Sequence, residues 1–185
     1  MTVQIITRNT ITLTPHLVPQ HVTRNSQRVT RNAKLATLPK EGIMPLENFG
    51  SILNFAEELE KQGQEFFAAV ARNPACAQHK EIFEQFASDA GKNVKAVQRT
   101  RRENVTEMIL EPIRDFTRAP FCEECAEAGS MTLDDALATT NRLVDRAERY
   151  YTAAAAKIKA QPEVSRALKT ICKKHKAHRE KLTAL

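Results

Sequence analysis

The chain has 185 residues and a net charge of +6, and its hydrophobic share of 42% and charged share of 27% are typical of a soluble globular protein. No apolar run approaches the roughly 18 residues of a membrane span, and the first 20 residues lack the apolar segment of a secretory signal. The four cysteines are too few and too unevenly spaced for a disulfide scaffold. We therefore expect reduced thiols in a cytoplasmic protein with no membrane span.

Residues 1–45 are predicted to form a basic, extended N-terminal arm. Residues 1–40 hold no Asp or Glu and account for the whole net charge of +6, so the rest of the chain is neutral. A short motif of a β-branched residue, Thr, Arg and Asn recurs at 6–9, 22–25 and 29–32, and the intervening prolines prevent a continuous helix.

This arm either keeps the chain soluble or binds an acidic protein partner or a neighbouring subunit. Nucleic acid is not the expected partner, because residues 1–40 contain no Phe, Tyr or Trp on which bases could stack. A transit peptide would fit the arginine-rich composition, but the prolines and the lack of an amphipathic helix count against it.

From Leu46 the apolar spacing becomes helical and predicts a first hairpin of two helices. The first helix ends at Asn73-Pro74, because the residue before a proline disfavours the helical conformation. The second begins near His79 and could continue to Leu110, before Pro112. The inner face of the first helix consists of Ile52, Phe55, Leu59, Phe66 and Val70.

A longer connection over residues 111–129 separates this hairpin from a second one. Ser130 or Thr132 is the expected cap of a third helix, whose first turn holds two aspartates that suit the helix dipole. Pro162 suits the first turn of a fourth helix. The predicted fold class is therefore all-α: a four-helix bundle over residues 46–185, with two hairpins joined by a long crossover.

Two segments resemble the ferritin-like superfamily, most closely its rubrerythrin-like branch. Residues 60–67, Glu-Lys-Gln-Gly-Gln-Glu-Phe-Phe, resemble that branch's pattern of a glutamate, a small residue and an aromatic pair, and residues 147–151, Ala-Glu-Arg-Tyr-Tyr, repeat its ending. The resemblance covers residues 46–185 and implies a ferritin-like bundle. It also implies a homo-oligomer such as a dimer, or a subunit of a larger assembly, because family members commonly pair their bundles.

The resemblance further implies a di-iron site, to which two helices each supply a Glu and the other two each supply a Glu-x-x-His. The first glutamate is present as Glu60. On the second helix, Ala90 and Asn93 stand at the Glu-x-x-His positions, and on the third helix Val144 stands at the glutamate position. One carboxylate cannot bridge and neutralise two iron ions, so a standard di-iron oxidase is not expected.

The fourth helix reads His175-x-x-His178, with histidine in place of glutamate. Two histidines and Glu60 have the composition of the facial triad that holds one metal ion with open positions. The site could hold a single iron, manganese or zinc ion, with Tyr151 nearby. The alternative is a satisfied polar pair inside the core, with the lysines around His175 on the solvated face.

The cysteines offer a second possible site. If the crossover runs the length of the bundle, Cys76-x-x-His79 and Cys122-x-x-Cys125 meet at one end as a tetrahedral set for a structural zinc. Alternatively, these cysteines are small residues packed in a cap, or Cys122 and Cys125 form a thiol–disulfide switch. Cys172 is expected to be a small core residue.

Three functions follow, and the sequence leaves open whether the protein is an enzyme. The first, which we favour because buried histidines are costly without a partner, is a rubrerythrin-like metal-binding protein with an altered, mononuclear site in redox or stress chemistry. The second is a catalytically inactive structural or assembly subunit that binds a partner through its basic arm. The third is a regulator that senses metal or redox state through the cysteines.

Overall fold

The computed structural model describes residues 44–104, 112–123 and 127–185. In this part of the chain there are four α-helices and no strand. The helices are α1 (Phe49–Arg72), α2 (Lys80–Glu103), α3 (Leu133–Lys157) and α4 (Pro162–Thr183). The predicted all-α class is thereby confirmed. The predicted arm lies outside the described residues up to residue 43, as does the expected continuation of α2 to Leu110.

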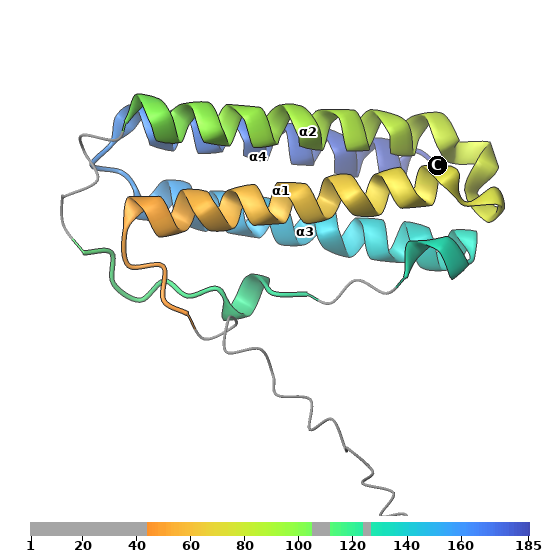
Figure 1. The fold of residues 1–185 in the computed structure, drawn as a ribbon, viewed down its shortest axis with the longest axis horizontal. Coiled ribbons are helices and arrows are strands. Elements are labelled where there is room, and N and C mark those ends of the chain that lie inside the picture. Colours follow the sequence, from red (N-terminus) through yellow and green to blue (C-terminus); the bar gives the residue numbers. More distant parts are fainter. Residues whose placement is uncertain (1–43, 105–111, 124–126) are drawn as a thin grey trace, which may run out of the picture. The chain divides into compact units, whose positions relative to one another are not determined.

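The four helices pack side by side as a bundle of two hairpins (Figure 1). The 3-10 helix η2 (Pro74–His79) turns the chain from α1 into α2, and residues 158–161 turn it from α3 into α4. Between the hairpins, α1 contacts α3 and α2 contacts α4. None of the described helices combines the length and the apolar character that crossing a lipid bilayer requires.

The connection between the hairpins runs along α1 wherever the structure describes it, and it contains the short 3-10 helices η4 (Ala119–Phe121) and η5 (Ala128–Ser130). Three hydrogen bonds mark its course: Leu46 N–H to Phe116 O (2.7 Å), the Gln62 side chain to Glu123 O (3.1 Å), and the Asn73 side chain to Ala128 O (3.0 Å). Because these donors lie at the start, middle and end of α1, α3 begins at the end of the bundle where α1 stops. This is the course predicted for the crossover.

Local signals set the ends of the helices. Asn48 caps α1 in a capping box, accepting from Ser51 N–H at 2.8 Å while the Ser51 hydroxyl accepts from Asn48 N–H at 3.2 Å. Thr132 caps α3, and Pro162 occupies the first position of α4. The predicted stop at Asn73, the cap at Thr132 and the start at Pro162 are confirmed.

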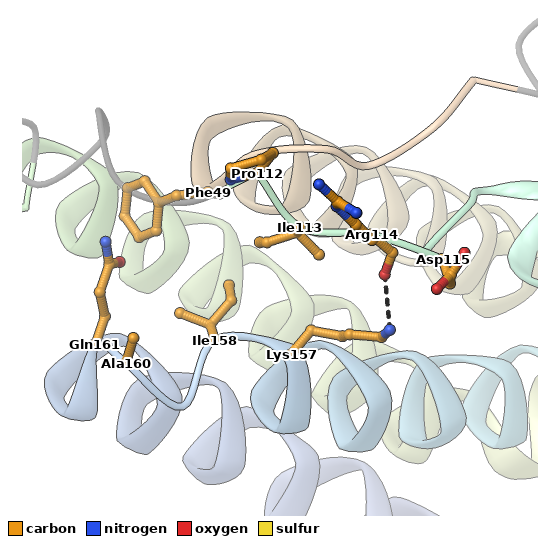
Figure 2. A pocket seen from close by; sticks show the side chains of 9 residues that line it. All are labelled: Phe49, Pro112, Ile113, Arg114, Asp115, Lys157, Ile158, Ala160 and Gln161. Atoms are coloured by element: carbon orange, nitrogen blue, oxygen red, sulfur yellow. Dashed lines mark hydrogen bonds between the residues drawn. The ribbon is translucent and has the colours of Figure 1, made fainter.

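A cavity of about 590 Å³ opens at the end of the bundle where α1 begins (Figure 2). Its walls include Phe49 of α1, Ile113 of the crossover and Ile158 after α3. The Lys157 ammonium donates to the carbonyl of Arg114 at 2.7 Å and so joins the crossover to the end of α3. Gln161 is the buried polar residue on its wall, and Glu60, Asn93 and His175 do not line it.

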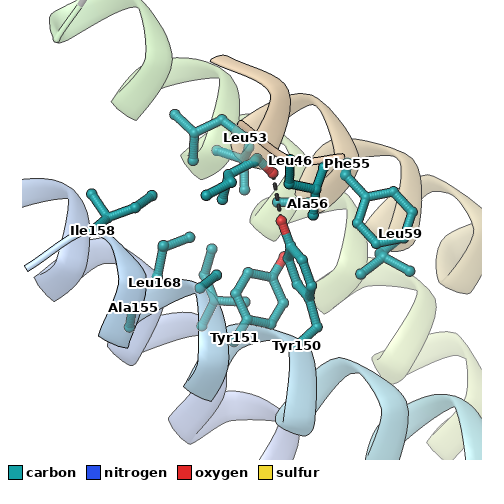
Figure 3. Packing of buried hydrophobic residues seen from close by; sticks show 14 of the residues in the cluster. Leu46, Leu53, Phe55, Ala56, Leu59, Tyr150, Tyr151, Ala155, Ile158 and Leu168 are labelled. Carbon is teal, nitrogen blue, oxygen red and sulfur yellow. Dashed lines mark hydrogen bonds between the residues drawn. The ribbon is translucent and has the colours of Figure 1, made fainter. Parts of the chain in front are cut away.

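Two apolar clusters fill the bundle core. One surrounds Tyr150, whose hydroxyl donates to Ile52 O at 2.6 Å and whose ring meets the Phe55 ring edge-on at 5.2 Å (Figure 3). The other contains the rings of Phe67 and Phe86, whose centroids are 5.6 Å apart. Along each helix, a buried polar side chain lies between the residues of the two clusters: Glu60 of α1, Asn93 of α2, Arg146 of α3 and His175 of α4. The candidate site is built around Glu60.

Candidate functional site

Glu60 of α1 is a carboxylate buried inside the bundle, with only 2% of its surface exposed. Its Oε1 lies 2.7 Å from Nε2 of His175 on α4. Its Oε2 accepts a hydrogen bond from Nδ2 of Asn93 on α2 at 3.2 Å. A buried carboxylate needs partners for its oxygens to offset the loss of water, and here both oxygens have one.

Lys174 extends this arrangement towards the surface. Its half-buried ammonium group donates to Oδ1 of Asn93 at 2.9 Å, so the amide joins a cation on one side to the Glu60 carboxylate on the other. We call Glu60, Asn93, Lys174 and His175 the core network. From the sequence, the lysines around His175 were expected on the solvated face. The structure contradicts this for Lys174, whose ammonium group reaches inward to Asn93.

The core network defines how the His175 ring is used. Nε2 of His175 faces the Glu60 carboxyl group, and the other ring nitrogen, Nδ1, is not part of that contact. Nδ1 is buried and has no hydrogen-bond partner among the described residues. The Tyr151 ring stacks on His175 at 5.6 Å, so the predicted nearness of Tyr151 is confirmed. Burial, with the Glu60 carboxylate adding to it, raises the pKa of Tyr151 well above its ordinary value.

His178 faces a different carboxylate. Its Nε2 lies 3.3 Å from Oδ2 of Asp89 on α2, and its ring stacks on Phe86 at 4.2 Å. Burial lowers the pKa of His178, and the neighbouring Asp89 offsets only part of that effect. Asp89 also accepts from Gln85 at 3.1 Å and from Lys92 at 3.0 Å. Burial raises the pKa of Asp89, but its hydrogen-bond donors outweigh burial and lower it to about 2.

Of the three predicted metal ligands, the structure thus joins Glu60 directly to His175 and pairs His178 with Asp89. Within the described residues, no group of three or more His, Cys, Asp and Glu side chains is arranged to hold a metal ion. A cavity of about 10 Å³ lies beside Glu60 and His175, about the room that one water molecule needs. Val144 lines this cavity and Asn93 bonds Glu60, so both residues lie beside Glu60 in the structure.

Sequence reasoning missed two members of the site, Lys174 and Asp89. A search for an acid followed three residues later by histidine on the same helix cannot find Asp89, because its partner, His178, lies on a different helix, α4. The available signal was its position, since Asp89 directly precedes Ala90 on the inner face of α2. Lys174 has a similar signal, because it directly precedes His175.

The cysteines lie at different levels of the bundle. Cys76 in η2 is fully buried, which raises the pKa of its thiol, whereas Cys122 in the crossover is exposed. The residue after Cys122 bonds Gln62, roughly 16 Å before Asn73 along α1 at 1.5 Å per residue. His79 bonds the side chain of Gln78.

The zinc set of Cys76, His79, Cys122 and Cys125 remains a prediction, because Cys125 lies outside the described residues. The same holds for a disulfide switch between Cys122 and Cys125. Cys172 is buried beside the larger apolar cluster, as expected of a small core residue.

Comparison with known proteins gives no match to this chain from a family model, from a curated protein or from a solved structure.

Proposed function

We propose that this chain is a ferritin-like four-helix bundle in which the core network replaces the metal centre, and that it serves as a non-catalytic structural or assembly subunit. The order of hairpin, crossover and hairpin supports the fold assignment, as does the course of the crossover along α1. The positions of Asn93 and Val144 around Glu60 support it further, because ferritin-like di-iron bundles carry ligands at these positions.

The hydrogen-bond chain from Lys174 through Asn93 to Glu60 is the observation that carries the proposal. Both oxygens of Glu60 already have protein donors, and the Lys174 ammonium supplies the positive charge that a metal would otherwise bring. Two cations repel each other more strongly in the low-dielectric core than they do in water. A divalent ion bound by Glu60 would have to displace at least one of these contacts, and the Lys174 ammonium would repel it.

The basic arm gives such a subunit a means of binding a partner. Residues 1–40 are basic throughout, whereas the bundle is neutral, so the charge that attracts an acidic protein is concentrated in one segment. The homo-oligomer implied by the family resemblance, with the arm reaching a neighbouring subunit, belongs to the same proposal.

The test is capture of partners by the immobilised full-length protein and by two charge variants. The arm variant replaces four arginines with glutamine: Arg8, Arg24, Arg28 and Arg31. The control variant removes the same charge from exposed positions of the bundle: Arg99, Arg102, Arg149 and Arg166. We expect one defined partner, or the chain itself, to be retained by the control and lost from the arm variant. Identical partners for all three proteins would contradict an arm-dependent role.

The altered mononuclear metal site is the second candidate, and one observation favours it. Glu60 Oε1 and His175 Nε2 lie 2.7 Å apart beside the cavity of about 10 Å³, and Nδ1 of both His175 and His178 is buried without a hydrogen-bond partner. A small shift of Glu60 and His175 would let both bind one iron, manganese or zinc ion, with His178 turning from Asp89 to complete the triad.

Titration of the full-length protein with Co²⁺, followed by visible absorption, separates the two candidates, because Co²⁺ occupies carboxylate and imidazole sites and absorbs according to its ligands. The core-network proposal predicts no saturable absorption band. A band that saturates in the native protein and is absent from both Glu60→Ala and His178→Ala would establish the metal site instead.

A further inference from the structure

An open groove of about 330 Å³ lies between α3 and α4, on a part of the surface that the proposed function does not use. This volume is at the lower end of the range that small-molecule sites occupy. Because α3 and α4 form one hairpin, the groove is built on two packed helices, with Lys159 of the turn between them on its rim. It is therefore a pre-formed feature of the fold.

The rim of the groove is strongly basic. Lys159, Lys169, Lys173 and Lys176 line it, and no acidic residue does. Among the described residues, the first three of these lysines have no ion-pair partner. Lys176 lies 3.8 Å from Glu148, but that carboxylate is shared with an arginine, Arg179, at 2.9 Å. The four ammonium groups thus produce a positive potential that the protein itself leaves largely uncompensated.

The floor of the groove is apolar. Its exposed part is the methyl group of Ala156 and the edge of Cys172, while Tyr151 and Ala155 lie buried beneath it. The Cys172 thiol is engaged within the protein, 3.4 Å from the hydroxyl of Thr152. The floor can therefore contact a compact hydrocarbon or aromatic group but offers it few hydrogen bonds.

We propose that this groove binds a small organic acid, with its carboxylate at the lysine rim and its apolar body on the floor at Ala156 and Cys172. Lysine suits the carboxylate because its ammonium is a mobile point charge with three donors, and several such groups share the anion without fixed geometry. The site needs neither a metal in the core nor the N-terminal arm, so it stands independently of the proposed function.

Isothermal titration calorimetry on the full-length protein provides the test. The probe is 2-naphthoate, compared with 2-naphthamide, which keeps the aromatic body without the charge, and with inorganic phosphate, which keeps the charge without the body. We expect saturable binding of 2-naphthoate at one site per chain, about tenfold tighter than either comparison compound. Equal binding of naphthoate and naphthamide, or absence of saturation by naphthoate, would overturn the proposal.

Matched charge reversals locate the site. Lys169→Glu with Lys173→Glu is expected to weaken 2-naphthoate binding by about tenfold, because each reversal replaces an attraction with a repulsion. The control, Lys95→Glu with Lys181→Glu, makes the same change in net charge away from the groove and is expected to leave affinity within about twofold. Equal weakening by both variants would show that binding follows net charge and would overturn the assignment.

Filling the groove tests the floor separately. Ala156 is exposed and lines the groove, so Ala156→Phe should occupy the space without disturbing the core, which unchanged thermal unfolding would verify. We expect this variant to lose 2-naphthoate binding while all four lysines remain. Undiminished binding in a folded Ala156→Phe protein would contradict an apolar body lying on this floor.

Discussion

Asp89 and His178 face each other across α2 and α4, and both ionise at lower pH in the folded protein than in the unfolded chain. For each group the unfolded state therefore binds protons more readily, and stability falls as the pH falls. For His178 this loss begins near the ordinary pKa of 6.5 and continues downward. For Asp89 it begins near 3.8 and extends to about 2. The two residues thus destabilise the fold in successive acidic windows.

Replacing His178 should remove the first of these windows. We expect the urea midpoint of the native protein to fall between about pH 7.5 and about pH 5.5, and the fall to be smaller in His178→Gln, which can still donate to Asp89 without gaining a proton. His79→Gln, in η2, is the control for the loss of a histidine elsewhere. The assignment would be wrong if His178→Gln and the native protein lost stability equally over this range.

Lys174 and Lys173 are adjacent, yet the structure gives them different roles in stability. Lys174→Met removes the donor to Asn93 Oδ1 inside the core network, and we expect it to cost about 1–2 kcal/mol of unfolding free energy. Lys173→Met changes an exposed residue and should alter stability by no more than about 0.5 kcal/mol. Urea unfolding of both variants checks this prediction. Equal unfolding free energies for the two variants would show that the Lys174–Asn93 hydrogen bond does not stabilise the core network.

At the scale of elements, Asn73 joins the end of α1 to the crossover. Its Oδ1 accepts from Ala75 N–H at 3.0 Å and so caps η2, while its Nδ2 donates to the carbonyls of Ala128 at 3.0 Å and Met131 at 2.9 Å. One side chain therefore fixes the turn of the first hairpin and the approach to α3. Asn48, by contrast, caps α1 through its Oδ1 alone.

Substitution by aspartate separates these two asparagines, because aspartate keeps the accepting oxygen and loses the donor. We expect Asn73→Asp to lower unfolding free energy by about 2–3 kcal/mol, since two carbonyls lose their donor and a carboxylate is buried beside them. Asn48→Asp should be neutral or stabilising by up to about 1 kcal/mol, because a negative charge suits the start of α1. Thermal and urea unfolding of both variants measure these changes. An Asn73→Asp protein as stable as the native protein would contradict the bridging role of Asn73.

The elements were predictable because their signals are local. Pro74 after Asn73, the Thr132 cap and Pro162 each act within a turn of their own position, and the apolar spacing identifies the inner face of each helix. Asn93 and Val144 were assigned to positions around Glu60 through the ferritin-like resemblance, and both lie beside Glu60 in the structure.

Pairings across helices were not predictable in this way. One residue along a helix turns a side chain by about 100°, so a small rotation of α4 decides whether His178 faces Glu60 or Asp89. The same rotation brings Lys174 inward to Asn93. Sequence periodicity gives the face of each helix but not its rotation against three neighbours, and the choice between a metal triad and the core network depends on that rotation.

At the scale of the whole molecule, the bundle packs two apolar clusters on either side of a polar layer that contains the core network. Buried polar groups of this kind contribute little net stability compared with apolar packing, but removing one member leaves the others unpaired. Glu60→Ala should therefore destabilise the fold by about 2–4 kcal/mol even without any metal, because His175 and Asn93 both lose their acceptor. Urea unfolding in the presence of a chelator measures this cost, and an unchanged midpoint would contradict it.

The metal content of the purified full-length protein tests the central claim most directly. The protein is dialysed against excess Fe²⁺ (under anaerobic conditions), Mn²⁺ or Zn²⁺ and then against buffer. Elemental analysis of the native protein should then find no stoichiometric ion bound at Glu60. If a variant retains metal, we expect it to be Lys174→Met, which lacks the opposing ammonium group. One equivalent of metal per chain in the native protein, lost in both Glu60→Ala and His178→Ala, would contradict the account.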